Sequence, residues 1–194
     1  KIPMVIARTG WSGELSYELY LQDRKKGDEL FEIVHEAAKE FNGAVIAPNT
    51  IRTIEGGLLS YQSDFGREHN PFTIGLDRLV DLDQDIDFIG KEALKRIKSE
   101  GISEKLVGVE IDGDPIQKVP ENFWPVFDEN HKKIGRLSRC FFSPRLKKNI
   151  GLAIIDINFV EPGTPLVIES PKAHLNAQVH ELPWFPAEKS TNLD

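Results

Sequence analysis

The chain has 194 residues, and its 24 Lys and Arg against 31 Asp and Glu leave a net charge of −7. An acidic chain is a poor electrostatic partner for nucleic acid or for an anionic membrane surface, so we expect it to bind neither. The lone cysteine, Cys140, excludes a disulfide within the chain, no signal peptide is visible, and no apolar run reaches the roughly 20 residues of a membrane span, which favours a cytoplasmic protein.

The first elements along the chain are predicted to form a β-hairpin. Residues 2–8 are apolar and rich in β-branched side chains, residues 9–13 have the glycines and serine of a turn, and residues 14–21 alternate in polarity. The alternation places Glu18 and Tyr20 on one face of the second strand and the leucines on the other. Because the chain opens in mid-strand without an initiator Met, we expect a fragment whose N-terminal half is missing.

The next segment predicts helices with short strands between them: a helix over 28–41, a strand over 44–47, a helix over 50–60, a strand over 76–82 and a helix over 90–100. Asp28 and Asn49 are the expected N-caps of the first two helices. Gly56 and Gly57 lower the helix propensity, which suggests that the second helix packs closely against another backbone.

From about residue 105 the pattern changes to short strands separated by turn signals, at 105–111, 124–127, 133–141, 150–155, 164–169 and 174–182. Such a series favours a small barrel or sandwich. The expected fold class is therefore α+β, with a first domain over 1–103 and a β-barrel domain over 104–194.

The residues show no recognisable metal or nucleophile motif. The segment from Asp81 to Glu92 has the length of a calcium loop, but Ile86 stands where that loop requires glycine. The histidines lack zinc-site spacing and Cys140 has no nucleophile signature, so we expect no metal site and a buried thiol. Taken alone, the residues indicate a two-part chain with an accessible polar strand face.

Three segments resemble, in the same order, the glycine-cleavage T-protein (aminomethyltransferase) family. They are residues 8–19 (RTGWSGELSYEL), residues 51–57 (IRTIEGG) and residues 143–151 (SPRLKKNIG). The resemblance implies that the first domain is the second half of a tetrahydrofolate-binding core and that the second domain is the family's C-terminal antiparallel β-barrel. The missing N-terminal half of the same protein would then hold the rest of the folate site.

The resemblance also implies roles for individual residues. Glu18 is expected to bind the pterin ring of tetrahydrofolate, whose ring N–H and exocyclic amino group can both donate to one carboxylate. Tyr20, on the same strand face, is expected to line the pocket. Arg52 is expected either to contact folate or to form an ion pair with a neighbour such as Glu55. The family's catalytic aspartate would lie in the missing half, so no catalytic residue is assigned.

Departures from the T-protein pattern look more like the dimethylsulfoniopropionate demethylases of the same family. Trp11 replaces a tyrosine, and residues 56–61, 70–72 and 75–80 differ in detail from the T-protein pattern. Separately, Pro48-Asn49 replaces an Arg-Asp pair whose arginine contacts folate, which suggests altered substrate handling. The implied reaction moves a methyl group from a small sulfonium substrate to N5 of tetrahydrofolate, giving 5-methyltetrahydrofolate and methylmercaptopropionate. Such a transfer needs two reactants held in line, and neither a metal nor a protein nucleophile.

Two alternatives stay open within this resemblance. A true aminomethyltransferase would take its aminomethyl group from the lipoyl arm of the glycine-cleavage H-protein, which requires a docking partner. A folate-binding protein without transferase activity is the other, although the cysteine motif of such members (KGCYxGQE) does not occur here. A homodimer is also left open.

Overall fold

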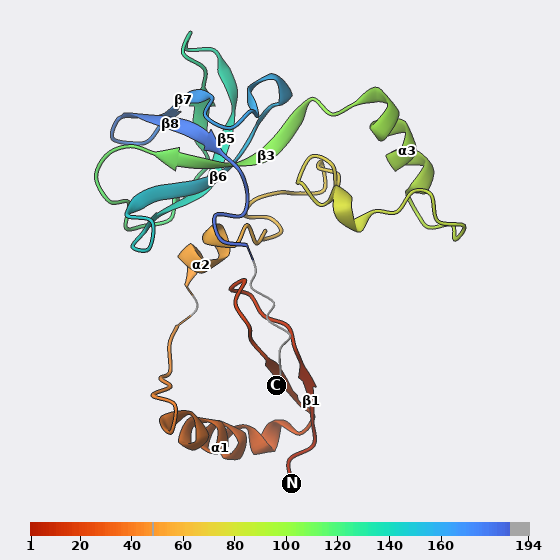
Figure 1. The fold of residues 1–194 in the computed structure, drawn as a ribbon, viewed down its shortest axis with the longest axis vertical. Coiled ribbons are helices and arrows are strands. Elements are labelled where there is room, and N and C mark those ends of the chain that lie inside the picture. The colour runs from red at the N-terminus through yellow and green to blue at the C-terminus, as the bar shows by residue number, and fades with distance from the viewer. Residues whose placement is uncertain (48, 187–194) are drawn as a thin grey trace.

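The computed structural model describes residues 1–47 and 49–186, which form a small β-barrel, a hairpin with one long helix, and a helical arm that projects to one side of the barrel (Figure 1). This arrangement confirms the predicted α+β class. Pro48, named above as a departure from the family pattern, and residues 187–194, predicted to belong to the barrel domain, lie outside the described residues.

Six strands close into an antiparallel barrel in the order β3-β6-β5-β4-β7-β8. They are β3 (Glu104–Ile111), β4 (Trp124–Phe127), β5 (Lys133–Ser143), β6 (Lys148–Asp156), β7 (Pro165–Glu169) and β8 (His174–His180). All six predicted strands are present. Inward-facing apolar side chains such as Leu137, Ile155 and Val109 fill the interior with no exposed surface. Closure removes the free sheet edges that would otherwise invite aggregation.

One strand of the barrel, β6, is buried on both faces. Ala153 and Ile155 point into the barrel, whereas Ile150, Leu152 and Ile154 belong to a second apolar cluster on its outside. The helix α2 (Thr50–Glu55) covers that outer face and contributes Ile51 and Ile54 to the cluster. Burial on both faces explains why residues 150–155 form a nearly continuous apolar run.

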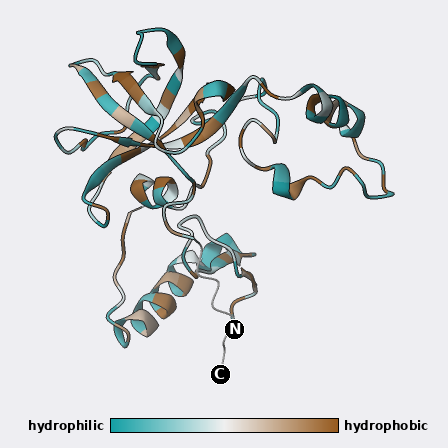
Figure 2. Cartoon of the chain, turned by 45° about the horizontal axis from the view of Figure 1, so that its top comes forward, coloured by the Kyte–Doolittle hydropathy of each residue, from teal (hydrophilic) through white to brown (hydrophobic). Residues whose placement is uncertain are grey.

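The first 47 residues form a separate layer that has no buried side chain. β1 (Met4–Ala7) pairs with β2 (Glu18–Leu21), with Ala7 opposite Glu18 and Val5 opposite Tyr20. A short 3-10 turn, η1 (Arg24–Lys26), leads into α1 (Gly27–Lys39). Apolar side chains on this layer stay exposed. Figure 2 marks the apolar residues of α1 as brown segments of the ribbon.

Two predicted strands are absent, and the reasons are local. Residues 44–47 have no regular secondary structure and pair with no strand in the described part of the chain, and the side chains of Val45 and Ile46 are exposed. In place of a strand over 76–82 the chain forms the 3-10 helix η2 (Asp77–Leu79). Gly75 has a φ of +71°, which reverses the chain, and the amide of Val80 then donates to the carbonyl of Asp77.

Two predicted helices have different starts or ends from those expected. α1 begins one residue before Asp28, which lies in its first turn and is not its cap; Asp23 caps the preceding η1 instead. Asn49 does cap α2, because its side-chain oxygen accepts the Ile51 amide at 2.9 Å. That helix ends at Glu55, since Gly56 and Gly57 stop it five residues before the predicted end.

The projecting arm, which lies between α2 and β3 in the sequence, contains α3 (Lys91–Glu100), and this helix matches the one predicted over residues 90–100. The first residue of this helix, Lys91, holds the acidic loop before it, because its ammonium group donates to the carbonyls of Gln84 and Ile86. Within the part of the chain that the structure describes, no helix is long and apolar enough to cross a bilayer.

Candidate folate cleft at the barrel face

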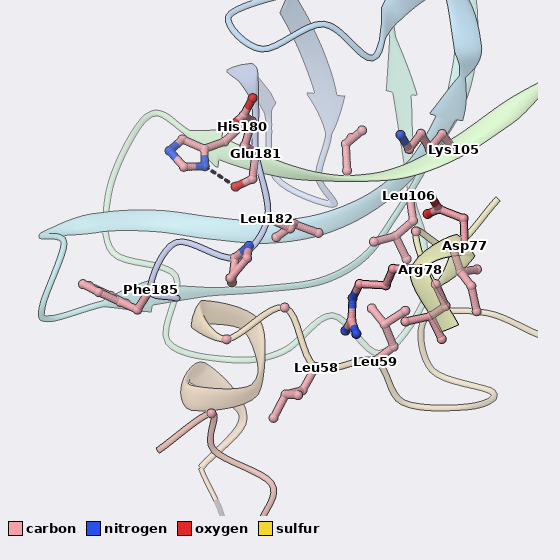
Figure 3. A pocket seen from close by; sticks show the side chains of 18 of the residues that line it. Leu58, Leu59, Asp77, Arg78, Lys105, Leu106, His180, Glu181, Leu182 and Phe185 are labelled. Carbon is pink, nitrogen blue, oxygen red and sulfur yellow. Dashed lines mark hydrogen bonds between the residues drawn. The ribbon is translucent and has the colours of Figure 1, made fainter. Parts of the chain in front are cut away.

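A cleft of about 980 Å³ lies between the hairpin turn, the end of α2 and the outer face of the barrel. Its walls come from six stretches that are far apart in the sequence: residues 8–10 and 13–16, 56–59, 74–78, 105–107, 160–162, and 180–183 with Phe185. Figure 3 shows Arg78 and Lys105 on one side of this cleft and Leu182 and Phe185 on the other. A hollow of this size is large enough for a cofactor-sized ligand.

The side chains of the hairpin turn form the hydrogen bonds that orient Glu18. The Thr9 hydroxyl donates to Glu18 Oε2, and the Ser16 hydroxyl donates to the carbonyl of Thr9 at 3.2 Å. Thr9 and Ser16 line the cleft, whereas Glu18, which is hydrogen-bonded to Thr9, is not itself part of the wall. Glu18 Oε1 has no hydrogen-bond partner among residues 1–47 and 49–186, so the carboxylate keeps acceptor capacity for a ligand.

The structure separates the three residues that the sequence analysis assigned to folate. Glu18 and Tyr20 both project from β2, and Tyr20 is exposed. Arg52 lies on α2 and forms the expected ion pair with Glu55, at 3.5 Å between Nη1 and Oε2. Neither Tyr20 nor Arg52 belongs to the cleft wall. Their contact with a ligand therefore stays a prediction.

A group of four charges joins the hairpin turn to the barrel. Glu14 Oε1 accepts from Arg52 Nη1 at 3.4 Å and from Arg145 Nη1 at 3.2 Å. Both guanidinium groups also lie 3.5 Å from Glu55 Oε2, whose side chain is only 3% exposed. The other oxygen of Glu55 accepts from the Ser143 hydroxyl at 2.7 Å. A buried carboxylate is costly unless it is paired, and these two arginines and one hydroxyl supply the pairing.

The segment after β8 forms another wall of the cleft and is fixed to the same group. The backbone amides of Trp184 and Phe185 donate to the carbonyl of Glu55, at 3.0 and 3.3 Å. The Arg145 guanidinium lies 3.8 Å from the centre of the Phe185 ring, a cation–π contact. Trp184 stacks on His180 with 5.1 Å between ring centroids. We refer to residues 181–186 as the C-terminal strap.

Glycines allow the turn and α2 to approach each other closely. A Cβ added to Gly56 would lie 3.7 Å from Gly13 Cα and 3.3 Å from the carbonyl of Arg52. Gly13 itself has a φ of +74°, which side-chain-bearing residues rarely adopt. The close backbone approach expected from Gly56-Gly57 is therefore present, and the hairpin turn is its partner.

Two residues of the barrel strands, Glu110 and Cys140, have pKa values shifted from their ordinary ones. Burial opposes ionisation of Glu110, but hydrogen bonds from Lys148 and Gln178 outweigh it and lower the pKa of that carboxyl. Burial raises the pKa of the Cys140 thiol to about 12, in keeping with the expected inert cysteine. The one grouping of potential metal ligands in the described part of the chain, Glu32 with His35 and Glu36, lies on the solvent side of α1.

Several residues that line the cleft or join its walls were not singled out by the sequence analysis. Arg145 and Glu14 had appeared only as letters within the family pattern, and Lys105 and Phe185 had no signal at all. These residues come together only through the packing of the barrel against α2 and the hairpin. A strand pattern can place a side chain on a face, but it cannot say which distant segment that face meets.

The hairpin, the helices and the closed antiparallel barrel, in that order along the chain, define an α+β fold with a C-terminal barrel. Two family models match: the GCVT N-terminal domain over residues 1–84 and the glycine cleavage T-protein C-terminal barrel domain over residues 104–186. The chain belongs to the glycine cleavage T-protein family.

Curated relatives include two differently named enzymes. The chain is 35% identical to an aminomethyltransferase of Geobacillus sp. (strain WCH70), over 97% of this chain and 51% of the relative. It is 28% identical to dimethylsulfoniopropionate demethylase DmdA of Ruegeria pomeroyi, over 94% of this chain and 49% of the relative. The chain thus spans about half the length of the curated relatives that it matches.

A solved structure shares the fold. The crystal structure of glycine cleavage system aminomethyltransferase T from Bartonella henselae superimposes with a TM-score of 0.72 at 20% sequence identity, covering 94% of this chain and 50% of that one. At this level of identity the likeness establishes the fold alone. It supports the assignment of the barrel and hairpin to the T-protein architecture.

Proposed function

We propose that the protein of which this chain is a part is a tetrahydrofolate-dependent one-carbon transferase, and that its reaction is the transfer of an aminomethyl group. The observation that carries the proposal is the Glu18 carboxylate, oriented by Thr9 at the edge of a cleft of about 980 Å³. Family membership and the aminomethyltransferase relatives at 33–36% identity favour aminomethyl transfer over the demethylation expected from the sequence pattern.

The free oxygen of Glu18 fits a reduced pterin. One carboxylate can accept both the ring N–H and the neighbouring amino group, and such charge-assisted pairs are roughly twice as strong as neutral hydrogen bonds. Thr9 takes one acceptor position on Oε2 and leaves the others available. We propose that Tyr20 contacts the bound pterin from the next outward position of β2, whereas Arg52 acts through Glu14 and Glu55.

The chemistry proposed for this site depends on holding two reactants together. In either candidate the bond from the transferred carbon to the donor's sulfur would break, releasing a thiolate or a thioether, as that carbon bonds to N5 of tetrahydrofolate and N5 gives up its proton. The protein's residues would bind and orient the two reactants and exclude water. Fixing two reactants in an attack geometry lowers the reaction barrier by about 7–11 kcal/mol in favourable cases. No residue of this chain is assigned a direct catalytic role.

A second candidate is demethylation of dimethylsulfoniopropionate, with formation of 5-methyltetrahydrofolate. Trp11 and Asn49 depart from the aminomethyltransferase pattern, and DmdA is among the relatives. This reaction needs a small sulfonium substrate, whereas aminomethyl transfer needs a lipoylated protein partner. The two candidates share the cofactor and differ in the donor.

The uncovered apolar layer of residues 1–47 supports a further part of the proposal, because exposed apolar patches of this kind mark contact surfaces. We propose that additional polypeptide of the same protein packs on this layer and completes the folate site. We also propose that the chain divides at about residue 103, directly before β3 begins at Glu104.

The test uses the full-length protein with tetrahydrofolate and either donor. Incubation with aminomethyl-loaded H-protein is expected to yield one-carbon-loaded tetrahydrofolate, and Glu18→Gln is expected to weaken folate binding because one acceptor becomes a donor. Product from dimethylsulfoniopropionate alone would support the second candidate. Folate binding without turnover on any donor would support a non-catalytic folate-binding protein, and absence of folate binding would refute all three.

A further inference from the structure

Three walls of the cleft meet at a single arginine of the barrel. Arg145 lies in the turn between β5 and β6, and its side chain contacts Glu14 of the hairpin turn, Glu55 at the end of α2 and Phe185 of the C-terminal strap. Glu14 and Phe185 line the cleft, and Glu55 directly precedes the wall residues 56–59. The partner on the hairpin is 131 positions away in the sequence.

This junction consists of two arginines and two glutamates, Arg52, Arg145, Glu14 and Glu55, whose charges sum to zero. Glu55 is nearly inaccessible, so its carboxylate needs a cation, and Arg52 and Arg145 both lie 3.5 Å from it. Two arginines around one carboxylate would leave one positive charge in excess. Glu14 supplies the second negative charge by accepting from both guanidinium groups. The exposed hairpin turn is thereby held to the barrel by a contact that its own weak packing does not provide.

Glu14 connects this junction to the proposed folate ligand. It lies two residues before Ser16, whose hydroxyl donates to the carbonyl of Thr9 and to the carbonyl of Glu14 itself. Thr9 in turn donates to Glu18. A displacement of Glu14 therefore moves the Ser16 and Thr9 groups on which the orientation of the Glu18 carboxylate depends.

We propose that Arg145 is a positioning residue for folate: it sets the hairpin turn, and through it Glu18, against the cleft. This inference rests on the proposed function. The arginine touches neither folate nor the reacting carbon, so it acts on the affinity for folate and leaves the chemical step unchanged. The flat guanidinium is suited to this role, because it can contact two carboxylates at its edge while its face stacks on Phe185.

The test measures tetrahydrofolate affinity and steady-state kinetics of the full-length protein. Arg145→Met and Glu14→Gln are each expected to raise the Kd and the KM for tetrahydrofolate about tenfold, because weakening one charge-assisted hydrogen bond by about 1.4 kcal/mol lowers affinity by that factor. The kcat at saturating folate and the KM for the one-carbon donor are expected to change by less than about twofold. Arg145→Lys, which keeps the charge, is expected to recover part of the affinity.

A double variant and a matched control isolate the proposed link. If Glu14 and Arg145 act as one unit, the double variant is no weaker than either single variant, because coupled residues are not additive. Lys147→Met removes an exposed positive charge from the same turn and is expected to bind folate like the unaltered protein.

The outcomes separate this inference from the function on which it rests. Unchanged folate affinity in Arg145→Met or in Glu14→Gln, losses that multiply in the double variant, or an equal loss in Lys147→Met would overturn the positioning role alone. If Arg145→Met does not fold, Glu14→Gln decides the question by itself. Failure of the unaltered protein to bind tetrahydrofolate would overturn the proposed function and this inference with it.

Discussion

The buried ion pair between Asp64 and Arg139 provides the sharpest test of how the two parts of the chain are joined. Asp64 has no exposed surface, and its carboxylate accepts from Arg139 Nε at 2.7 Å, Arg139 Nη2 at 2.6 Å, Ser138 Oγ at 2.9 Å and the Ser60 amide at 2.7 Å. The acid follows α2 in the first part of the chain, and the arginine lies on β5 of the barrel. Replacing Asp64 by Asn keeps the shape and removes the charge.

The expected loss of stability comes from the Arg139 guanidinium, which stays buried without its partner. Breaking a buried ion pair from one side costs about 3–5 kcal/mol, because the remaining guanidinium is buried without a counter-charge. We therefore expect Asp64→Asn to lower the free energy of unfolding by about 4 kcal/mol. With a urea dependence of about 2 kcal/mol per molar, the unfolding midpoint falls by about 2 M.

Urea unfolding followed by tryptophan fluorescence measures this shift, because Trp124 and Trp184 both pack against the barrel. A double variant, Asp64→Leu with Arg139→Met, serves as the control: apolar replacement of both partners often restores most of the stability. A loss below about 1 kcal/mol in Asp64→Asn, or a double variant less stable than the single one, would show that the pair is not buried as described.

Three further predictions address packing and titration. Ile54→Ala is expected to lower the free energy of unfolding in urea by about 2–5 kcal/mol, because Ile54 is fully buried between α2 and the barrel. The control Ile89→Ala, at a fully exposed position, is expected to leave stability unchanged, and equal effects of the two variants would contradict the packing. Cys140, with a pKa of about 12 from burial, is expected to resist a thiol reagent at pH 8 until urea unfolds the barrel, so rapid labelling of the folded protein would refute its burial. Glu110→Gln is expected to destabilise the protein at pH 7 and to have little effect at pH 3. The pKa of Glu110 is lower in the folded state than its ordinary value of 4.5, so its ionised form stabilises the fold above that pH, and this stability is lost as the pH falls. The same loss of unfolding free energy at both pH values would contradict this sign.

Local patterns predicted most of the barrel and the helices correctly. Each barrel strand is a run whose alternate side chains face one apolar interior, so composition and turn signals were sufficient to locate it. The errors occurred where a strand needs a partner or a glycine reverses the chain. Residues 44–47 have strand composition but no strand beside them, and Gly75 turns residues 77–79 into a 3-10 helix.

The sequence by itself determined the fold class and the family, because both depend on local periodicity and on the order of short motifs. It also identified Glu18 as the candidate folate ligand. Only the tertiary structure brought Arg145 to Glu14 and Asp64 to Arg139, across 131 and 75 positions. Such partners depend on how a closed barrel packs against α2, and the side chain of an isolated arginine or aspartate has the same local pattern whether it meets a partner or water.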